Sequence, residues 1–174
     1  FTYMNIHFET QRYIVRDIEQ IDIEDMFEMD SDPEVHQYLG KKPVKSIQES
    51  EVIIRYIRAQ YKKYDMGRWA VIDKKSNEFL GWTGLKYETK VRKSFNYYDL
   101  GYRFKKKYWG QGIATETAEA SLKYGFDTLG LTKICAAVEV NHMASHVILK
   151  KIGFKCVEVF GFEDVLHHWY EILK

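Results

Sequence analysis

The most informative segment of this 174-residue chain reads Leu100-Gly101-Tyr102-Arg103-Phe104-Lys105-Lys106-Lys107-Tyr108-Trp109-Gly110-Gln111-Gly112-Ile113-Ala114-Thr115-Glu116. A β-like run leads into a turn with two glycines, and a helical pattern follows at once. Glycine tolerates positive φ and lets a ligand approach the backbone, and a helix start presents unpaired N–H groups and the positive end of its dipole. The segment predicts a phosphate or pyrophosphate site, although an ordinary strand-to-helix loop shares the pattern.

Two better-known phosphate motifs do not fit the same turn. A P-loop would end in Gly-Lys-Ser or Gly-Lys-Thr, which is absent here. A Rossmann fingerprint would need a third glycine and an earlier strand. Four cations, Arg103 and Lys105 to Lys107, flank the turn.

The residues after the turn predict a helix that packs closely on a sheet. Small side chains recur along residues 113–128 at spacings of four, three and four, which places them on one helical face. They are Ala114, Ala118, Ser121 and Gly125.

Patterns elsewhere predict one α/β domain over residues 1–174, with a mixed, mostly antiparallel sheet of about six or seven strands and helices on both faces. Two short helices are expected within residues 21–39, separated at Ser31-Asp32-Pro33. Further helices are expected at 46–63, 113–128 and 144–152. The expected strands are 13–16, 69–72, 79–87, 97–104, 133–139, 154–160 and 165–173.

Composition limits the classes of partner. The chain has 26 Lys plus Arg and 25 Asp plus Glu, so its net charge of +1 gives no reason to expect nucleic acid or an anionic membrane. Cys135 and Cys156 form no CxxC pair, and we expect no metal site. The sequence has no signal peptide and no long apolar run, so we expect a cytoplasmic protein.

Several motifs together resemble a known family. Lys107-x-x-Gly110-x-Gly112 with Ala114 resembles the Arg/Gln-x-x-Gly-x-Gly/Ala signature of GNAT N-acetyltransferases. The string Tyr-Trp-Gly-Gln-Gly-Ile-Ala-Thr-Glu is similar to the branch named for ribosomal-protein N-terminal acetyltransferases (Rim type). Residues 12–16, 31–35 and 145–154 also resemble that branch, so the likeness runs from about residue 9 to the C-terminus.

The resemblance implies that acetyl-CoA lies between two splayed central strands, residues 97–104 and 133–139. Pantetheine would pair with the first strand's backbone, N–H groups of the glycine turn would hold the pyrophosphate, and an exposed lysine of the turn would bind the extra phosphate. Family members place an Asn three residues before the Ser of the last helix, whereas Asn141 lies four before Ser145, which leaves Asn141 or His142 for that role. The cofactor-binding residues so implied are Tyr102, Arg103, Phe104, Lys107, Gly110, Gln111, Gly112, Ile113, Ala114, Thr115 and Asn141.

The family chemistry is acetyl transfer to a primary amine by direct attack in a ternary complex. It needs a polarised thioester, a proton acceptor for the amine and a donor to the leaving thiolate. The last helix lacks the Tyr that many GNAT enzymes use as general acid, so the resemblance gives that role to Ser145. The base candidates are carboxylates, with Asp99 first because it lies on the strand entering the turn, followed by Glu88, Glu139 and Glu163.

The expected partners are acetyl-CoA and an amine acceptor, either a protein N-terminus or a small molecule such as an aminoglycoside or a polyamine. A homodimer is left open. The alternative of another class is a non-catalytic acyl-CoA-binding sensor. A nucleic-acid-binding module using Lys105 to Lys107 is disfavoured by the near-neutral charge.

Overall fold

A computed structural model describes residues 4–174, within which eight strands form one sheet. The strand order is β1-β2-β3-β4-β5-β6-β8-β7, and every neighbouring pair is antiparallel except β5 with β6. The strands are β1 (Ile6–Glu9), β2 (Tyr13–Asp17), β3 (Arg68–Asp73), β4 (Phe79–Glu88), β5 (Tyr97–Phe104), β6 (Lys133–Glu139), β7 (Lys155–Phe162) and β8 (Val165–Leu173).

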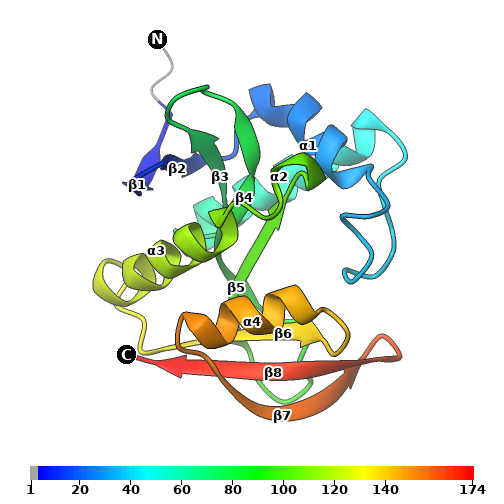
Figure 1. The fold of residues 1–174 in the computed structure, drawn as a ribbon, viewed down its shortest axis with the longest axis vertical. Helices are drawn as coiled ribbons and strands as arrows, with labels where there is room; N and C mark the ends of the chain where they lie inside the picture. The colour runs from blue at the N-terminus through cyan, green and yellow to red at the C-terminus, as the bar shows by residue number, and fades with distance from the viewer. Residues whose placement is uncertain (1–3) are drawn as a thin grey trace.

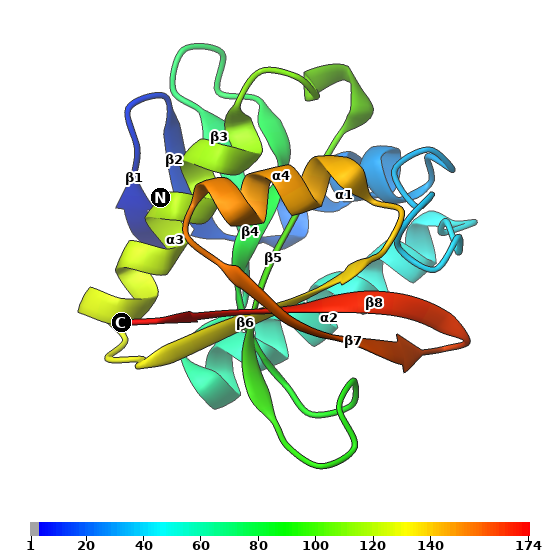
Figure 2. The ribbon, with the colours of Figure 1, turned by 60° about the horizontal axis from the view of Figure 1, so that its bottom comes forward.

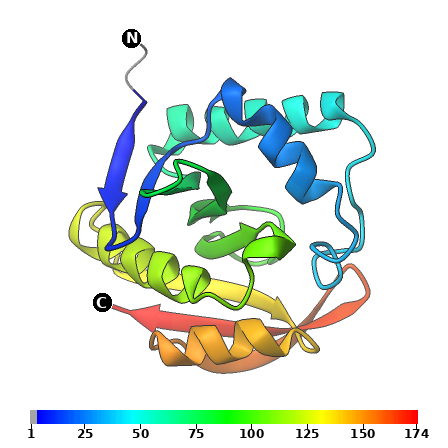
Figure 3. The same ribbon diagram turned by 45° about the horizontal axis from the view of Figure 1, so that its top comes forward.

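Helices cover both faces of the sheet. Figure 3 shows α1 and α2 on one side of the strands and α3 and α4 on the other. None of the helices in residues 4–174 is long and apolar enough to cross a membrane. The α-helices are α1 (Ile23–Asp30), α2 (Ile47–Tyr64), α3 (Ile113–Asp127) and α4 (Met143–Lys151), and short 3-10 turns lie at Gln20–Asp22 and Lys106–Tyr108.

The mixed fold with helices on both faces is confirmed, and two details of the prediction are wrong. The sheet has eight strands instead of six or seven, because β1 pairs with β2 and its four residues are too short to show a period. The second early helix is absent from the described chain, since residues 33–40 form successive turns. Asp32 and His36 accept i→i+3 bonds from Val35 and Leu39, and the chain then reverses at Gly40, whose φ is +88°.

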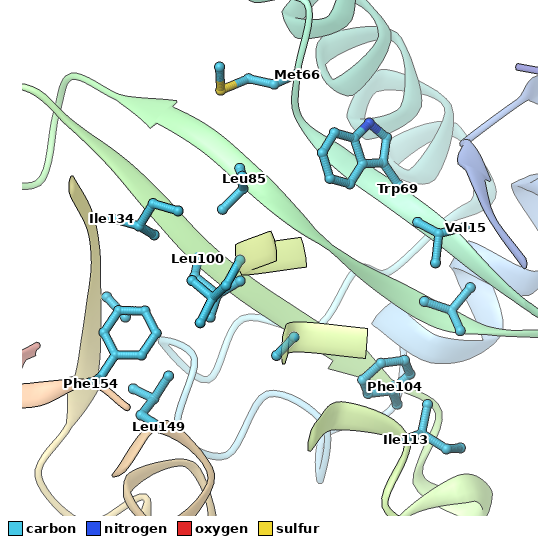
Figure 4. Close-up of a cluster of buried hydrophobic side chains, with 14 of the residues drawn as sticks. Val15, Met66, Trp69, Leu85, Leu100, Phe104, Ile113, Ile134, Leu149 and Phe154 are labelled. Atoms are coloured by element: carbon cyan, nitrogen blue, oxygen red, sulfur yellow. The ribbon is translucent and has the colours of Figure 1, made fainter. Parts of the chain in front are cut away.

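Each face of the sheet has its own hydrophobic core. The larger core lies under α3 and α4 and includes Leu85, Leu100, Phe104 and Ile134 (Figure 4). The second core lies under α1 and α2 and includes Met26 and other apolar residues of those helices and of β3. Because both faces are covered, side chains that alternate along a central strand point into different layers.

The small-residue face of α3 packs on the sheet as predicted. Ala118 and Ser121 are fully buried, and Gly125 lies against β4 and β6. A Cβ at Gly125 would come within 2.6 Å of Leu85 Cδ1 and 3.0 Å of Ile134 Cδ1. The small side chains therefore let α3 pack closely on the sheet. This close packing fixes the position of the glycine turn that precedes the helix.

The central strands β5 and β6 are paired at only one position. Their parallel ladder consists of Asp99 opposite Cys135. Beyond this pair the strands diverge, β5 toward α1 and β6 along α4 (Figures 1 and 2). The splay implied by the family resemblance is present, and it leaves the β6-facing backbone edge of residues 100–104 without a strand partner.

We expect Gly125→Val to lower the free energy of unfolding by about 2 kcal/mol, the typical cost of overfilling a core. The added side chain must push back Leu85 and Ile134, which are themselves buried. Denaturant unfolding would measure the loss. Glu119→Val is the matched control, because Glu119 is an exposed residue of the same helix and receives the same β-branched side chain. An equal loss in both variants would show that helix propensity, and not close packing, is responsible.

Candidate active site

A cleft opens where β5 and β6 part. Its volume is about 920 Å³, and it reaches both sheet faces. The loop of residues 38–42 forms one wall, the ends of β5 and β6 with the start of α4 form the floor, and the β7–β8 turn forms the other wall. The cleft is therefore open to a ligand that pairs with the free strand edge.

The glycine turn has the geometry of an anion cradle. Gly110 and Gly112 have φ of +77° and +76°, and Gly112 is the N-cap residue of α3. No side chain caps this helix start. The first amides of α3 therefore stay free for a ligand, with the helix dipole adding positive potential.

The four cations near the turn pair with acidic residues of α1 and of the segment after it. Arg103 Nη1 donates to Asp30 at 2.8 Å, and Lys105 Nζ lies 2.7 Å from Asp25 and 2.6 Å from Glu28. Lys106 pairs with Glu34, and Lys107 lies 3.2 Å from Glu28. These side chains hold α1 and the segment that follows it, and this does not fit the expectation that an exposed lysine here binds the extra phosphate.

Ser145 lies in the cleft with a tyrosine as its partner. Tyr102 on β5 donates its hydroxyl hydrogen to Ser145 Oγ at 3.1 Å, and Ser145 Oγ is 3.4 Å from His142 Nε2. Burial raises the pKa of Tyr102 to about 12, so the phenol remains a donor at neutral pH. The sequence predicts Tyr102 only as a cofactor-binding residue, because the contact of its hydroxyl with Ser145 joins residues 43 positions apart.

Asn141 and His142 differ in their position relative to the cleft. His142 lines it and stacks on Tyr38 with ring centroids 4.8 Å apart, whereas Asn141 is exposed and is not part of the lining. Burial lowers the pKa of His142, so its ring is neutral at pH 7 and can accept or donate one hydrogen bond. Of the two candidates left open by the sequence, His142 faces the ligand space.

The carboxylates proposed as bases fall into two groups. Asp99 Oδ2 accepts a hydrogen bond from Arg68, and burial raises the pKa of Asp99 despite that partner. Glu88 pairs with Lys86 at 3.0 Å and accepts two backbone N–H groups. Glu139 and Glu163 line the same cleft and form no ion pair with another residue of the described chain. Within residues 4–174, no group of three or more His, Cys, Asp or Glu is arranged to hold a metal ion.

Comparison with known proteins agrees with this geometry. Residues 12–155 match the model of the acetyltransferase (GNAT) domain. The chain belongs to the GNAT acetyltransferase family. It is 32% identical over 148 residues to the uncharacterized N-acetyltransferase YoaA of Bacillus subtilis, an alignment that covers 84% of this chain and 81% of YoaA.

Solved GNAT structures share the whole fold. A GNAT acetyltransferase from Bacillus anthracis superposes with a TM-score of 0.80 at 25% identity, covering 98% of both chains. RimL, a ribosomal L7/L12 α-N-protein acetyltransferase solved with coenzyme A, gives a TM-score of 0.82 at 13% identity, covering 97% of this chain and 98% of RimL, which concerns the fold alone. This GNAT protein is an acetyl-CoA-dependent N-acetyltransferase that transfers acetyl groups to amines. The predicted membership of the GNAT family is confirmed, and the fold is shared with Rim-type structures.

We expect Gly112→Val to weaken acetyl-CoA binding by about tenfold or more, because a β-branched residue strains a positive φ by about 1–2 kcal/mol and moves the amides of the cradle. Calorimetry would measure the dissociation constant. Gly130→Val is the matched control, since Gly130 has a φ of +71° just beyond the other end of α3 and a Cβ there would meet nothing within 4 Å, whereas a Cβ at Gly112 would meet only Arg12 Nη2, at 3.4 Å. Similar losses of stability in both variants, with weaker binding only in the first, are expected. Unchanged affinity in a folded Gly112→Val would contradict the pyrophosphate site.

Proposed function

We propose that this GNAT enzyme acetylates a primary amine by direct attack within a ternary complex, with acetyl-CoA in the gap between β5 and β6. The observation that carries the proposal is the single Asp99–Cys135 pair, beyond which the strand edge is free. Backbone groups of Tyr102, Arg103 and Phe104 bind pantetheine at this edge. Amides between Lys107 and Thr115, with the cradle residues Gly110, Gln111, Gly112, Ile113 and Ala114 among them, bind the pyrophosphate. Asn141 stays at the rim, and His142 faces pantetheine.

Acid and base come from opposite faces of the sheet. Tyr102 packs with the core under α3 and α4, on the side of Ser145. Along β6, Cys135 and Ala137 pack with Trp169 on the other face, and Glu139 follows them at the same alternation. The amine therefore approaches a thioester in the gap from the face of Glu139. The thiolate leaves toward the opposite face, where Ser145 and Tyr102 lie.

Strand register supports Glu139 as the base. Asp99 and Cys135 are level, and beyond this pair Tyr102 follows three residues further along β5 and Glu139 four residues further along β6, so both lie on the side of the pair where the strands part. Asp99 lies three residues before Tyr102 on β5, which is about 10 Å at 3.3 Å per residue. Its carboxylate accepts a hydrogen bond from Arg68. The expectation that Asp99 acts as base does not fit this placement, and we propose Glu139 in its stead.

In the proposed step, acetyl transfer is coupled to proton transfers. The amine lone pair attacks the thioester carbon, and Glu139 removes one proton from the amine nitrogen as the C–N bond forms. The C–S bond breaks, and the thiolate takes the proton of Ser145 while Ser145 takes the hydroxyl proton of Tyr102, which water then restores to the tyrosine. Before this transfer Tyr102 donates a hydrogen bond to Ser145, which makes the serine a better donor as negative charge develops on sulfur.

The acceptor is proposed to be a protein N-terminus or a small amine. Glu139, Glu163 and Asp164 line the cleft and can pair with a cationic amine, while Lys41 and Lys42 line it as well. Thioester consumption with a panel of amines, including spermidine, an aminoglycoside and peptides with free N-termini, tests the function. Coenzyme A binding with no turnover on any member of the panel would count against it.

Two further features are proposed for the chain as a whole. All eight strands of residues 4–174 belong to one sheet, which supports a single domain. We propose a homodimer, because β7 is an edge strand with exposed Val157 and Val159 that a second copy would cover.

We expect Ser145→Ala to keep acetyl-CoA affinity and to lose about tenfold or more in kcat, since the hydroxyl acts mainly as thiolate charge develops. Steady-state kinetics with the best amine of the panel would measure it. Tyr102→Phe should lose less, and the double variant should lose little more than Ser145→Ala, because the two hydroxyls act in one chain. A lower melting temperature with unchanged kcat would reduce Ser145 to a structural residue.

We expect Glu139→Gln to lower kcat by about a hundredfold at pH 7, the low end of general-base contributions. An amide cannot take the proton that the amine nitrogen loses as the C–N bond forms, but hydroxide can, so the deficit should shrink as the pH rises. Rate profiles from pH 6.5 to 9.5 would show this. Glu163→Gln is the matched control in the same cleft and should lose much less. A Glu163→Gln deficit as large as that of Glu139→Gln, with the same pH profile, would reassign the base.

A further inference from the structure

The turn between β1 and β2 lies against the first turn of α3. Thr10 Oγ1 donates to Glu116 Oε2 at 2.5 Å, and the backbone N–H of Arg12 donates to the same oxygen at 3.1 Å. Arg12 Nε donates to Glu116 Oε1 at 2.8 Å, and Arg12 Nη1 donates to the backbone oxygen of Gln111 at 3.0 Å. The N-terminal turn therefore holds both the glycine cradle and the helix that follows it.

Glu116 poses an electrostatic problem for the site. It is the acidic residue in the first turn of α3, where a carboxylate stabilises the helix but repels a diphosphate bound at the same end. Burial opposes its ionisation, yet the hydrogen bonds from Thr10 and Arg12 outweigh that and lower the pKa of Glu116. The carboxylate is thus charged at neutral pH, and both of its oxygens are turned toward the N-terminal turn.

Arg12 also fixes one peptide unit of the cradle. Its Nη1 holds the carbonyl of Gln111, and in a trans peptide the N–H of the next residue, Gly112, points the opposite way. The guanidinium is close to the turn, because a Cβ built on Gly112 would lie 3.4 Å from Arg12 Nη2. The amide of Gly112 is thereby aimed away from Arg12 and kept free of an internal partner.

We propose that Arg12 is a positioning residue for the diphosphate of acetyl-CoA: it offsets the charge of Glu116 at the start of α3 and orients the Gln111–Gly112 peptide of the cradle. This role rests on the proposed placement of the diphosphate at the glycine turn. It makes the turn between β1 and β2 part of the cofactor site, although it is about a hundred residues away in sequence.

The test compares Arg12→Ala, Glu116→Gln and the double variant by calorimetry with coenzyme A. Arg12→Ala should bind about tenfold more weakly, an effect of the size expected for an uncompensated charge at a partly buried helix terminus. Glu116→Gln should bind at least as tightly as the wild type. The double variant should regain most of the affinity, because the repelling charge is gone, and a role in stability alone would not give this recovery.

Two readouts separate cofactor positioning from other effects. With saturating acetyl-CoA, kcat of Arg12→Ala should stay near the wild-type value while KM for acetyl-CoA rises. With acetyl-pantetheine, which lacks the diphosphate, Arg12→Ala and wild type should have equal kcat/KM. Lys74→Ala is the matched control, since Lys74 Nζ holds the backbone oxygen of Thr10 at 2.7 Å in the same turn but does not contact the cradle.

Three results would overturn the proposal. The first is an unchanged affinity of Arg12→Ala for coenzyme A, and the second is an equal loss of affinity in Lys74→Ala. The third is a double variant whose affinity is as low as that of Arg12→Ala, which would make Arg12 a direct phosphate ligand. A wild-type protein that binds no coenzyme A would instead remove the proposed cofactor site itself. Wild-type binding is therefore measured first, and it separates the two failures.

Discussion

The unpaired edge of β5 is the constraint on which the rest of the structure depends. A strand in the middle of a sheet normally has both backbone edges bonded, and buried N–H and C=O groups without partners cost free energy. Here β5 is bonded to β4 along its whole length but to β6 only at Asp99 and Cys135. The polar groups that β6 leaves free are the ones a pantetheine chain can satisfy, so the fold carries a site that a ligand completes.

Such an edge has to be held open, and the side chains below the cleft do this. Arg68 on β3 donates to the backbone oxygens of Gly84 and Asp99 and to the Asp99 carboxylate. Its guanidinium lies flat against β5, where a Cβ at Gly101 would come within 2.8 Å of it. Arg103 is fixed in the same layer by Asp30 and by the ring of Trp82. Both arginines therefore anchor β5 from the face opposite α3, at the level where the strand parts from β6.

Much of this could be predicted from the sequence because local patterns determine it. Strands 97–104, 133–139 and 165–173 agree with the structure to the residue, since each is an apolar or alternating run bounded by turn residues. The small-residue face of α3 and the two-glycine turn before it are equally evident from the sequence. What could not be predicted depends on pairs far apart in the chain, such as Tyr102 with Ser145 and Arg12 with Glu116. Nothing near Asp99 in sequence shows that Arg68 neutralises it.

The lysine run shows why local charge misleads about a site. Lys105 to Lys107 directly follow β5, and their sequence pattern predicts a phosphate-binding cluster. In the structure, however, all three form ion pairs with acidic residues of α1 and of the turns that follow it. Exposed pairs such as Lys106 with Glu34 add little stability, whereas Lys105 is buried between two carboxylates and fastens α1 to the end of β5. Because those cations are paired with carboxylates, the groups that remain at the cradle are the amides of α3 and the side chain of Arg12. The positive charge of Arg12 offsets the negative charge of Glu116. If the diphosphate binds at the proposed position, its affinity depends mainly on how the backbone of residues 110–115 is held.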